Sequence, residues 1–490
     1  MSAVVVAAAD EKFDTQVPLI IVGAGAAGLC AALAATEAGL DAVVVERDDI
    51  PSGSTALSAG LIPAAGTRFQ RDKGIADSPD LFAADIQRKA KGEADPAIVG
   101  VAAVGAAPLV EWLSDHYGLP FDLIDNFNYP GHSAMRMHGL PSRTGRELID
   151  RLRDAAEAND IVILAKSTAQ RLFADSDSRI RGVEVARRDG SCERIGCEAI
   201  ILACNGFGGN PELVRRHIPE MAEALYFGHP GNQGDAIIWG DALGAQLSDL
   251  GAYQGHGAVA TPHNILITWA TIMQGGIQVN GEGRRFCDET RGYSEQAAEV
   301  LRQPGGFAWT VFDTRIAIVA RQFDDFQKAE SIGAILAADS IESLASAMRV
   351  PAAAFVAEWN DVENLKSSGG QDRYGRRFSA DQACNPPLHA VKVTGALFHT
   401  QGGLAIDSKG RVKRRDGRSF PNLFAAGGAA AGVSGSTAAG YLSGNGLLTA
   451  TVLGRLTGET AAEQILHSRG GSLPSGSTPA FSQGAGSSAG

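Results

Sequence analysis

The chain has 490 residues, enough for two or three domains, and its formal net charge of −12 argues against a nucleic-acid-binding surface. Its six cysteines are scattered and form no Cys-x-x-Cys pair, which excludes a redox dithiol and a haem attachment site and favours a reducing, cytoplasmic compartment. We expect neither a secretory signal nor an apolar stretch of the roughly 18 residues that a membrane span needs.

The most informative segment lies near the N-terminus. An apolar run at residues 19–22 predicts a buried parallel strand, and the Gly-x-Gly-x-x-Gly pattern at 23–28 predicts a tight turn that opens a helix of small residues. In such a unit the glycines permit the turn, a close approach to a pyrophosphate, and close packing of helix on strand. A second strand at 42–45 ends at Glu46, whose carboxylate can accept protons from both ribose hydroxyls. Their order predicts a dinucleotide site.

Further along the chain the strand and helix pattern is interrupted and then resumes. Strand-like segments at 161–164, 182–186 and 199–203 lead into a glycine turn at 204–211, which we expect to lie against the same dinucleotide rather than to open a second nucleotide fold. The alternation of strands and helices then stops and returns near the C-terminus. The expected parts are an N-terminal tail at 1–17, a discontinuous nucleotide-binding domain at 18–250 and 385–468, an inserted domain at 251–384, and a disordered tail at 469–490.

Several other segments carry the motifs of a flavoprotein family. They are Gly-Ser-Thr-Ala-Leu-Ser-Ala-Gly at 53–60, Asn-Gly-Phe-Gly at 205–208, Gly-Arg-Arg-Phe at 283–286, His-Thr-Gln-Gly-Gly at 399–403, Leu-Phe-Ala-Ala-Gly at 423–427, and a glycine-rich run at 440–447. With them, the chain resembles over about residues 18–465 the family of fumarate reductase, succinate dehydrogenase, urocanate reductase and 3-ketosteroid dehydrogenase. The resemblance implies an α/β fold in which a Rossmann-like FAD-binding domain is interrupted by an α+β capping domain on the substrate side.

The resemblance also implies FAD as the cofactor. The residues expected to bind it are Gly23, Gly25, Ala26, Ala27, Gly28, Glu46, Arg47, Ser54, Thr55, Ser58, Ala59, Gly60, Ala169, Ala203, Asn205, Gly206, Asp235, Gly427, Gly428, Ser443, Asn445 and Leu447. Family members that bond the flavin covalently use a histidine after the second strand, and residues 46–70 contain none, so we expect non-covalent FAD. No metal site is expected. Because the chain has no haem or iron–sulfur ligation pattern, we expect an external electron donor or acceptor.

The implied chemistry is hydride transfer between flavin N5 and one carbon of a C–C or C=C bond, with a proton exchanged at the neighbouring carbon. The bond must lie beside a carbonyl or carboxylate that can be polarised. His399 precedes a Gly-Gly turn as the family's substrate-binding histidine does, and His256 matches the second such histidine. Arg291 is the nearest candidate for the family's proton-donating arginine, although its spacing from Phe286 is shorter by two residues; Tyr293 is the competing proton carrier.

Tyr441 marks a departure from the fumarate reductases, which have at this position an arginine that grips a substrate carboxylate. A tyrosine offers one hydroxyl and no charge, so a C4 dicarboxylate is disfavoured and an activated carbonyl is favoured; packing of Tyr441 against the flavin is the alternative. Three functions stay open. They are a reductase or dehydrogenase acting beside a carbonyl or monocarboxylate, a 3-ketosteroid dehydrogenase-type enzyme acting on a large apolar ketone, and a non-catalytic flavin-binding electron-transfer subunit.

Overall fold

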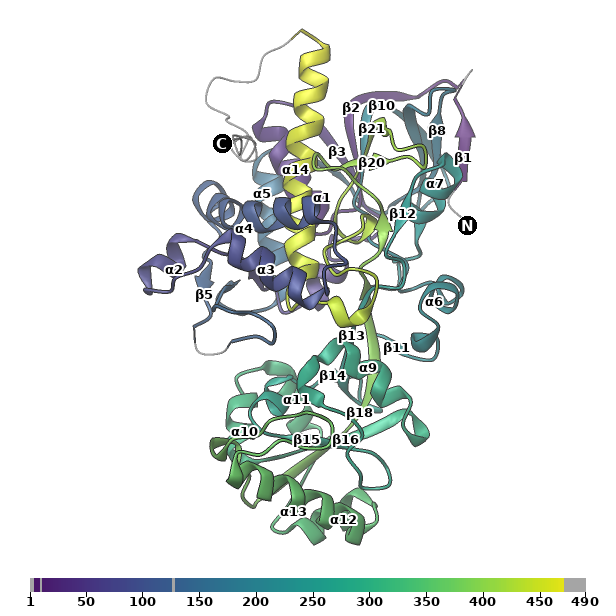
Figure 1. The fold of residues 1–490 in the computed structure, drawn as a ribbon. Coiled ribbons are helices and arrows are strands. Elements are labelled where there is room, and N and C mark those ends of the chain that lie inside the picture. Colours follow the sequence, from purple (N-terminus) through teal and green to yellow (C-terminus); the bar gives the residue numbers. More distant parts are fainter. Residues whose placement is uncertain (1–3, 9–10, 126–127, 471–490) are drawn as a thin grey trace. The chain divides into compact units, whose positions relative to one another are not determined.

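The computed structural model describes residues 4–8, 11–125 and 128–470, and the chain divides into two compact units (Figure 1). Unit 1 comprises Met1–Ile218, Gly228–Tyr253 and His399–Gly490, and unit 2 comprises Pro219–Phe227 and Gln254–Phe398. Helices and strands alternate along much of the described chain, which confirms the α/β class expected from the sequence.

Unit 1 is built on a nine-stranded sheet with the strand order β1-β8-β9-β10-β2-β3-β7, which β20 and β21 join at β10. Its strands, together with those of two small sheets, are β1 Val4–Ala7, β2 Thr15–Val22, β3 Ala42–Val45, β4 Ile62–Pro63, β5 Asp122–Leu123, β6 Met137–Gly139, β7 Val162–Leu164, β8 Ser167–Ala174, β9 Ile180–Arg187, β10 Cys192–Leu202, β12 Leu247–Ser248, β19 Gly403–Leu404, β20 Arg411–Lys413 and β21 Ser419–Ala425. Strand β2 pairs in parallel with β10 and β3, β3 with β7, and β10 with β21. The carboxyl ends of these strands therefore meet at one edge of the sheet, where ligands bind in such folds.

Two apolar helices of unit 1, α1 and α14, lie side by side (Figure 1), and α5 packs against α1 and α4 against α14. The helices are α1 Ala26–Glu37, α2 Arg68–Asp72, α3 Pro79–Lys89, α4 Pro96–Tyr117, α5 Gly145–Ala158, α6 Pro211–His217, α7 Asp235–Leu243 and α14 Asn445–Ser468, with 3₁₀ turns η1 Ser54–Leu57, η6 Gly427–Ala429 and η7 Ala438–Gly440. A Cβ at Gly454 or Gly458 would lie 2.4 or 2.1 Å from a carbonyl oxygen of α1. These two glycines therefore permit the close approach of α14 to α1.

Unit 2 is a seven-stranded sheet with the order β14-β13-β18-β16-β15, to which β11 and β17 add beside β18. Its elements are β11 Leu225–Tyr226, β13 Tyr253–Ala260, β14 Ile265–Leu266, β15 Ile277–Val279, β16 Phe307–Asp313, β17 Ile335–Ala338, β18 Leu388–Thr400, α8 Ala270–Met273, α9 Tyr293–Leu301, α10 Thr314–Ala320, α11 Asp324–Ser331, α12 Ile341–Met348, α13 Ala352–Ser368, and 3₁₀ turns η2 Pro219–Met221, η3 Glu289–Arg291, η4 Pro304–Gly306 and η5 Ala380–Gln382. The core contains fully buried aromatic side chains, among them Phe312, Phe326 and Phe355.

The boundaries of the two units differ from those expected at 251 and 384. Unit 2 extends to Phe398 because β18 pairs with β16 along most of its length, and it takes in Pro219–Phe227 because β11 pairs with β18. Part of the expected N-terminal tail is strand, since β1 pairs in parallel with β8 and β2 begins at Thr15. The expected C-terminal tail lies outside the described residues from 471 onward.

One helix in the described part of the chain corrects the expectation that no apolar stretch is long enough to span a membrane. Helix α4 has 22 residues and a mean hydropathy of 1.7 over its most apolar window, which by length and composition alone would suffice. Within the structure 61% of that window is buried, as in a core helix.

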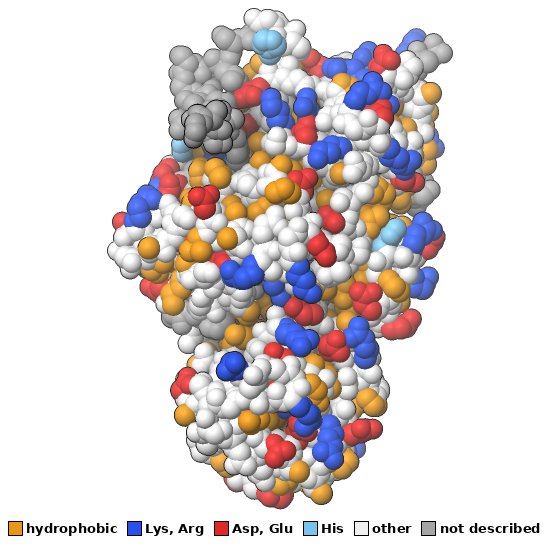
Figure 2. All heavy atoms as spheres, in the orientation of Figure 1, with side chains coloured by type: hydrophobic (Ala, Val, Ile, Leu, Met, Phe, Trp, Pro, Cys, Tyr) orange, Lys and Arg blue, Asp and Glu red, His pale blue; other side chains and the backbone are white. Residues whose placement is uncertain are grey.

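Basic and acidic side chains are interspersed over the face of the molecule that Figure 2 shows.

Candidate active site

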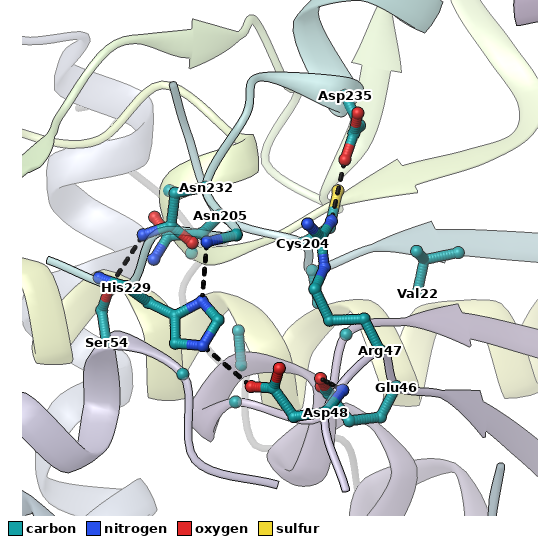
Figure 3. Close-up of a pocket in the computed structure, with 18 of the residues that line it drawn as sticks. Val22, Glu46, Arg47, Asp48, Ser54, Cys204, Asn205, His229, Asn232 and Asp235 are labelled. Atoms are coloured by element: carbon teal, nitrogen blue, oxygen red, sulfur yellow. Dashed lines mark hydrogen bonds and ion pairs between the residues drawn. The ribbon is translucent and has the colours of Figure 1, made fainter. Parts of the chain in front are cut away.

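A pocket opens in unit 1 where β2, β3 and β10 end (Figure 3). Its empty space, part of which is open to solvent, amounts to about 770 Å³. The predicted cofactor residues that line it are Gly23, Gly25, Ala26, Ala27, Glu46, Arg47, Ser54, Thr55, Ala169, Ala203, Asn205, Asp235, Gly427 and Gly428. Outside its lining lie Gly28, Ser58, Ala59, Gly60, Gly206, Ser443, Asn445 and Leu447.

The glycines of the first turn have separate reasons to be glycine. Gly23 has a φ of +104°, and a Cβ there would lie 2.6 Å from the carbonyl oxygen of Ala203. A Cβ on Gly28 would lie 1.8 Å from the Gly23 oxygen, so Gly28 is required by the packing of helix on strand. A Cβ on Gly25 would meet only the Thr55 hydroxyl, at 3.6 Å. The fold itself does not require glycine at 25, so we infer that this space suits a ligand rather than protein packing.

Glu46 is held in place by the backbone around it. Its Oε2 accepts from the Ala24 N–H at 2.7 Å and its Oε1 from the Asp48 N–H at 2.9 Å, and the residue is 8% exposed. Each carboxylate oxygen keeps further acceptor capacity, as ribose hydroxyls would need. At the start of α1, the Ala26 N–H donates to Thr55 Oγ1 at 3.1 Å. The chemistry of this donor and acceptor set fits a dinucleotide such as FAD.

Charged and polar side chains link the walls of the pocket to one another. Figure 3 shows Arg47 reaching Asp235, with Nη2 and Oδ2 2.9 Å apart, and His229 reaching Asp48, with Nε2 and Oδ2 2.8 Å apart. The remaining ring nitrogen, Nδ1 of His229, accepts from the Gly231 N–H at 3.0 Å. These contacts connect the residues that follow β3 with the first residue of α7 and the segment before it.

Sequence reasoning missed about half of the lining. The residues that it did not name individually are Val22, Val45, Asp48, Gly53, Ser167, Thr168, Cys204, His229, Gly231, Asn232, Trp239 and Ala450, although Gly53 and Cys204 lie in the segments 53–60 and 204–211 that it associated with the flavin. A signal was present for some of them: Asp48 follows Glu46 by two residues, and the stretch 229–235 carries proline and glycine before the predicted Asp235. Trp239 is 1% exposed, and its indole N–H has no partner in the described part of the chain, which leaves a buried donor at the pocket.

His399 and Tyr441, two of the four predicted catalytic residues, lie together in unit 1. Their ring centroids are 5.7 Å apart, and the rings meet edge to face. A Cβ built on Gly446 would lie 2.7 Å from His399 Nε2 and 3.7 Å from the Tyr441 hydroxyl, so both polar atoms lie close to the first turn of α14. Tyr441 itself follows η7, four residues before α14 begins at Asn445.

The environment of His399 keeps its imidazole neutral. Burial lowers the pKa of His399 to about 4. Its Nδ1 lies 3.0 Å from Gln401 Nε2 and 3.3 Å from the Thr400 carbonyl oxygen. Tyr441 is 6% exposed. The two side chains can therefore offer hydrogen bonds to an oxygen at neutral pH, but no positive charge.

His256 lies in unit 2 within an aromatic cluster. Its ring stacks on Tyr293, with centroids 4.9 Å apart, and on Phe398 at 5.5 Å, and it meets Trp269 edge-on. Burial lowers the pKa of His256 to about 3, and its Nδ1 accepts from the Ala258 N–H at 3.2 Å. His256 is thus a second neutral imidazole whose proton is on Nε2.

The two candidates for the proton carrier also lie in unit 2. Arg291 ends η3 and its side chain is exposed. Tyr293 begins α9 and is half-buried against His256. Tyr293 thereby contacts one of the predicted site histidines.

Comparison with known proteins gives the family. The family described as FAD binding domain matches residues 19–447. A probable fumarate reductase of Shewanella frigidimarina is 30% identical over 94% of this chain and 76% of its own length, and a urocanate reductase of Eggerthella lenta is 28% identical over 93% and 76%. The chain therefore belongs to this family of FAD-binding proteins, and it is an FAD-dependent oxidoreductase of the class that acts on CH–CH groups.

Solved structures agree on the fold. The open conformation of a flavocytochrome c3 fumarate reductase, 28% identical, matches 93% of this chain and 79% of its own with a TM-score of 0.79. A 3-ketosteroid-Δ4-(5α)-dehydrogenase from Rhodococcus jostii, 23% identical, matches 94% and 100% with a TM-score of 0.76. The family resemblance inferred from the motifs is confirmed.

Proposed function

We propose that the protein transfers hydride between FAD and one carbon of a C–C or C=C bond that lies beside a carbonyl or a carboxylate. FAD supplies the hydride chemistry when it is bound. The observation that carries the proposal is that His399 Nε2 and the Tyr441 hydroxyl both lie near Gly446, in the first turn of α14. Two donors aimed at one substrate oxygen stabilise the negative charge that develops there as the bond reacts.

The proposed site disfavours a C4 dicarboxylate. Tyr441 stands where the fumarate reductases carry an arginine, and burial leaves its neighbour His399 neutral. A carboxylate bound against neutral donors alone would lose its hydration without gaining a counter-charge. An activated carbonyl needs only hydrogen bonds, so it suits this donor set better.

The proton exchanged at the neighbouring carbon needs its own carrier. We propose that Tyr293 or Arg291 supplies it, with His256 binding substrate. Tyr293 is supported by its stacking on His256, and Arg291 by its place after the Gly-Arg-Arg-Phe motif. Replacing Arg291 with Gln and Tyr293 with Phe, one at a time, separates the two, because only loss of the carrier should suppress solvent-deuteron incorporation into product.

A 3-ketosteroid dehydrogenase-type activity is the second candidate. It is supported by the aromatic cluster of unit 2, in which His256 is flanked by Tyr293, Phe398 and Trp269, since a large apolar ketone would bury its rings against such a surface. Bleaching of the oxidised flavin by a saturated or partly saturated ketosteroid would select this activity. A flavin subunit that only transfers electrons would show no bleaching with any compound.

We propose that FAD is held without a covalent bond and exchanges electrons with an external partner. His229 lines the pocket, but both of its ring nitrogens are already engaged, by Asp48 and by the Gly231 N–H. Acid precipitation should leave the yellow chromophore in the supernatant; a coloured pellet would show a covalent bond. The six free thiols suit a reducing compartment, so we propose a cytoplasmic location, which fractionation of the native cells tests.

The test of the function is stopped-flow absorbance of the flavin against a panel of enones, enoates, saturated ketones and steroids. With a reactive compound, Tyr441→Phe should keep FAD yet slow flavin reduction or reoxidation at saturation by about 10²–10³-fold. Tyr117→Phe is the matched control, because Tyr117 packs edge-on against Trp112 at the end of α4. Unchanged kinetics in Tyr441→Phe would return this tyrosine to a packing role.

A further inference from the structure

A line of buried side chains stands behind His399. Gln401 Nε2 lies 3.0 Å from His399 Nδ1. Ser434 continues the line, because its hydroxyl donates to Gln401 Oε1 at 2.8 Å and accepts from Asn445 Nδ2 at 3.1 Å. Gln401 is 4% exposed, Ser434 2% and Asn445 0%. None of these three contacts is needed to form a strand or a helix.

The line has a direction, set by which atoms can donate. Asn445 Nδ2 carries protons only, so the single proton of the Ser434 hydroxyl must go to Gln401 Oε1. The Gln401 amide then turns its nitrogen toward His399. An amide nitrogen cannot accept a hydrogen bond, so His399 Nδ1 is the acceptor and the imidazole proton lies on Nε2.

The backbone offers His399 a competing contact. The Thr400 carbonyl oxygen lies 3.3 Å from Nδ1 and would favour a proton on that nitrogen. The contact to Gln401 is shorter, at 3.0 Å, and a proton on Nδ1 would there set two donors against each other. The opposite tautomer requires both the Gln401 and the Asn445 amides to turn over.

We propose that Gln401, held by Ser434 and Asn445, is a positioning residue that fixes His399 as the Nε2–H tautomer and thereby selects substrates activated by an uncharged carbonyl oxygen. The inference rests on the proposed function and narrows its substrate class to enones and ketones, as opposed to free carboxylates. His399 Nε2 and the Tyr441 hydroxyl both lie near Gly446, and an enolate oxygen within reach of both would gain two hydrogen bonds.

In unit 2 the tautomer of the site histidine is set by a backbone group. There the Ala258 N–H donates to Nδ1 of His256 at 3.2 Å and sets the same tautomer. A backbone amide cannot be given a charge by substitution, whereas Gln401 can. Gln401 is therefore the position at which the charge of a site histidine can be changed by one side chain.

The first experiment needs no substrate. The FAD-loaded protein is labelled with ¹⁵N in its ten histidine rings, and the His399 signals are assigned by their loss in His399→Asn. We expect the pattern of a neutral ring protonated on Nε2 from pH 8 down to pH 5. A ring protonated on Nδ1, or an imidazolium at pH 7, would overturn the inference and leave the proposed function standing.

The second experiment changes the charge behind the ring. In Gln401→Glu the carboxylate accepts from Nδ1–H, which should raise the pKa of His399 by about one to three pH units and improve kcat/KM for enoates relative to enones. Gln401→Met keeps the volume but frees the tautomer, and it should slow turnover of an enone by about 10–100-fold at unchanged FAD content. Gln464→Glu and Gln464→Met, at a glutamine of α14 that bonds the Pro421 carbonyl, are the matched controls.

The two experiments together separate the possible failures. If both Gln401 variants keep the wild-type ¹⁵N pattern and the wild-type preference between enones and enoates, the inference falls. If neither variant folds with FAD, the inference is judged by the tautomer of His399 in the wild-type protein. It stands with a proton on Nε2 and falls with a proton on Nδ1. If the Nε2–H pattern is found but only enoates change the flavin spectrum, the inferred substrate class falls and the proposed function stands. If no enone, ketone, enoate or steroid changes the spectrum, the proposed function falls and the fixed tautomer stands.

Discussion

The nucleotide pocket and the His399 region lie in the same unit and use opposite electrostatics. The pocket is bordered by charged side chains that contact one another, Arg47 with Asp235 and Asp48 with His229. Around His399 the donors are a phenol, two amides and a hydroxyl. In the function proposed above, cofactor binding relies on charge and backbone amides, whereas substrate activation relies on neutral hydrogen bonds whose direction must be set. Substitutions in the two regions should therefore have different consequences.

The largest effect is expected from Gly25→Leu, which should yield a folded protein without FAD. The backbone of Gly25, with φ −74° and ψ −175°, is allowed for any residue, and the added Cβ would meet only Thr55 Oγ1 at 3.6 Å. The leucine side chain would occupy the place of the pyrophosphate. The measurement is the ratio of flavin absorbance to protein absorbance after purification.

Gly100→Leu is the matched control for this substitution, because a Cβ at that glycine of α4 would meet nothing within 4 Å. It should keep full FAD content. FAD bound at a one-to-one ratio in Gly25→Leu would show that the pyrophosphate lies elsewhere.

A smaller effect is expected from Glu46→Gln. The amide would turn an NH₂ group toward one of the two backbone N–H groups that Glu46 accepts, from Ala24 and Asp48. The cost of that contact falls on the apoprotein and the FAD-bound protein alike, whereas the loss of a ribose hydrogen bond to the charged acceptor, about 1.5–3 kcal/mol, corresponds to a roughly 10–150-fold weaker binding of FAD. Titration of the apoprotein with FAD, followed by quenching of flavin fluorescence, measures the change.

The control for Glu46→Gln is Glu193→Gln, which removes one partner of the partly exposed pair with Arg187. It should leave FAD affinity unchanged, since isolated surface pairs contribute little. Equal affinities in Glu46→Gln and wild type would contradict the ribose-binding role.

Much of the fold followed from local pattern. The strand, turn, helix and strand from 19 to 46 could be read directly, because each element there is set by its own residues. The true extent of unit 2 could not be read from the sequence. It depends on β18, a strand that β16, β17 and β11 approach from distant parts of the chain, and pairing of that kind leaves no trace in any one segment.

The predicted site residues show the same division. Glu46 and the glycines could be predicted because a spacing in one segment defines them. His229 and Asn232 reach the pocket only because their segment folds against Ser54, to whose hydroxyl Asn232 Nδ2 donates at 2.9 Å. The line behind His399 was equally hidden, since Gln401 and Ser434 are 33 residues apart in the sequence.

Acidification should weaken the fold because of its buried neutral histidines. Burial lowers the pKa of His256 to about 3 and those of His132 and His138 to about 4, whereas in the unfolded chain all three are near 6.5. Below pH 6.5 the unfolded chain therefore binds protons that the folded protein does not. The free energy of unfolding should fall by up to about 1.4 kcal/mol per pH unit for each histidine between pH 6.5 and about 4. Urea unfolding of wild type and His138→Asn at pH 7, 6 and 5 measures the slope, which should be shallower in the variant.

The smallest effect is expected in how the rate of flavin bleaching by substrate depends on pH. A weak dependence is the result that supports a neutral His399. With its pKa near 4, His399 stays almost wholly neutral down to pH 5, so flavin bleaching by a carbonyl substrate should change less than about twofold between pH 8 and pH 5. An imidazole with the ordinary pKa of about 6.5 would lose its neutral form about 30-fold over that range. Stopped-flow rates should be taken only where circular dichroism shows a folded protein, because the fold weakens in the same direction. A rate that falls with a midpoint near pH 6.5 in folded protein would mean that His399 titrates normally, and the contrast between a charged pocket and a neutral substrate site would fail at its central residue.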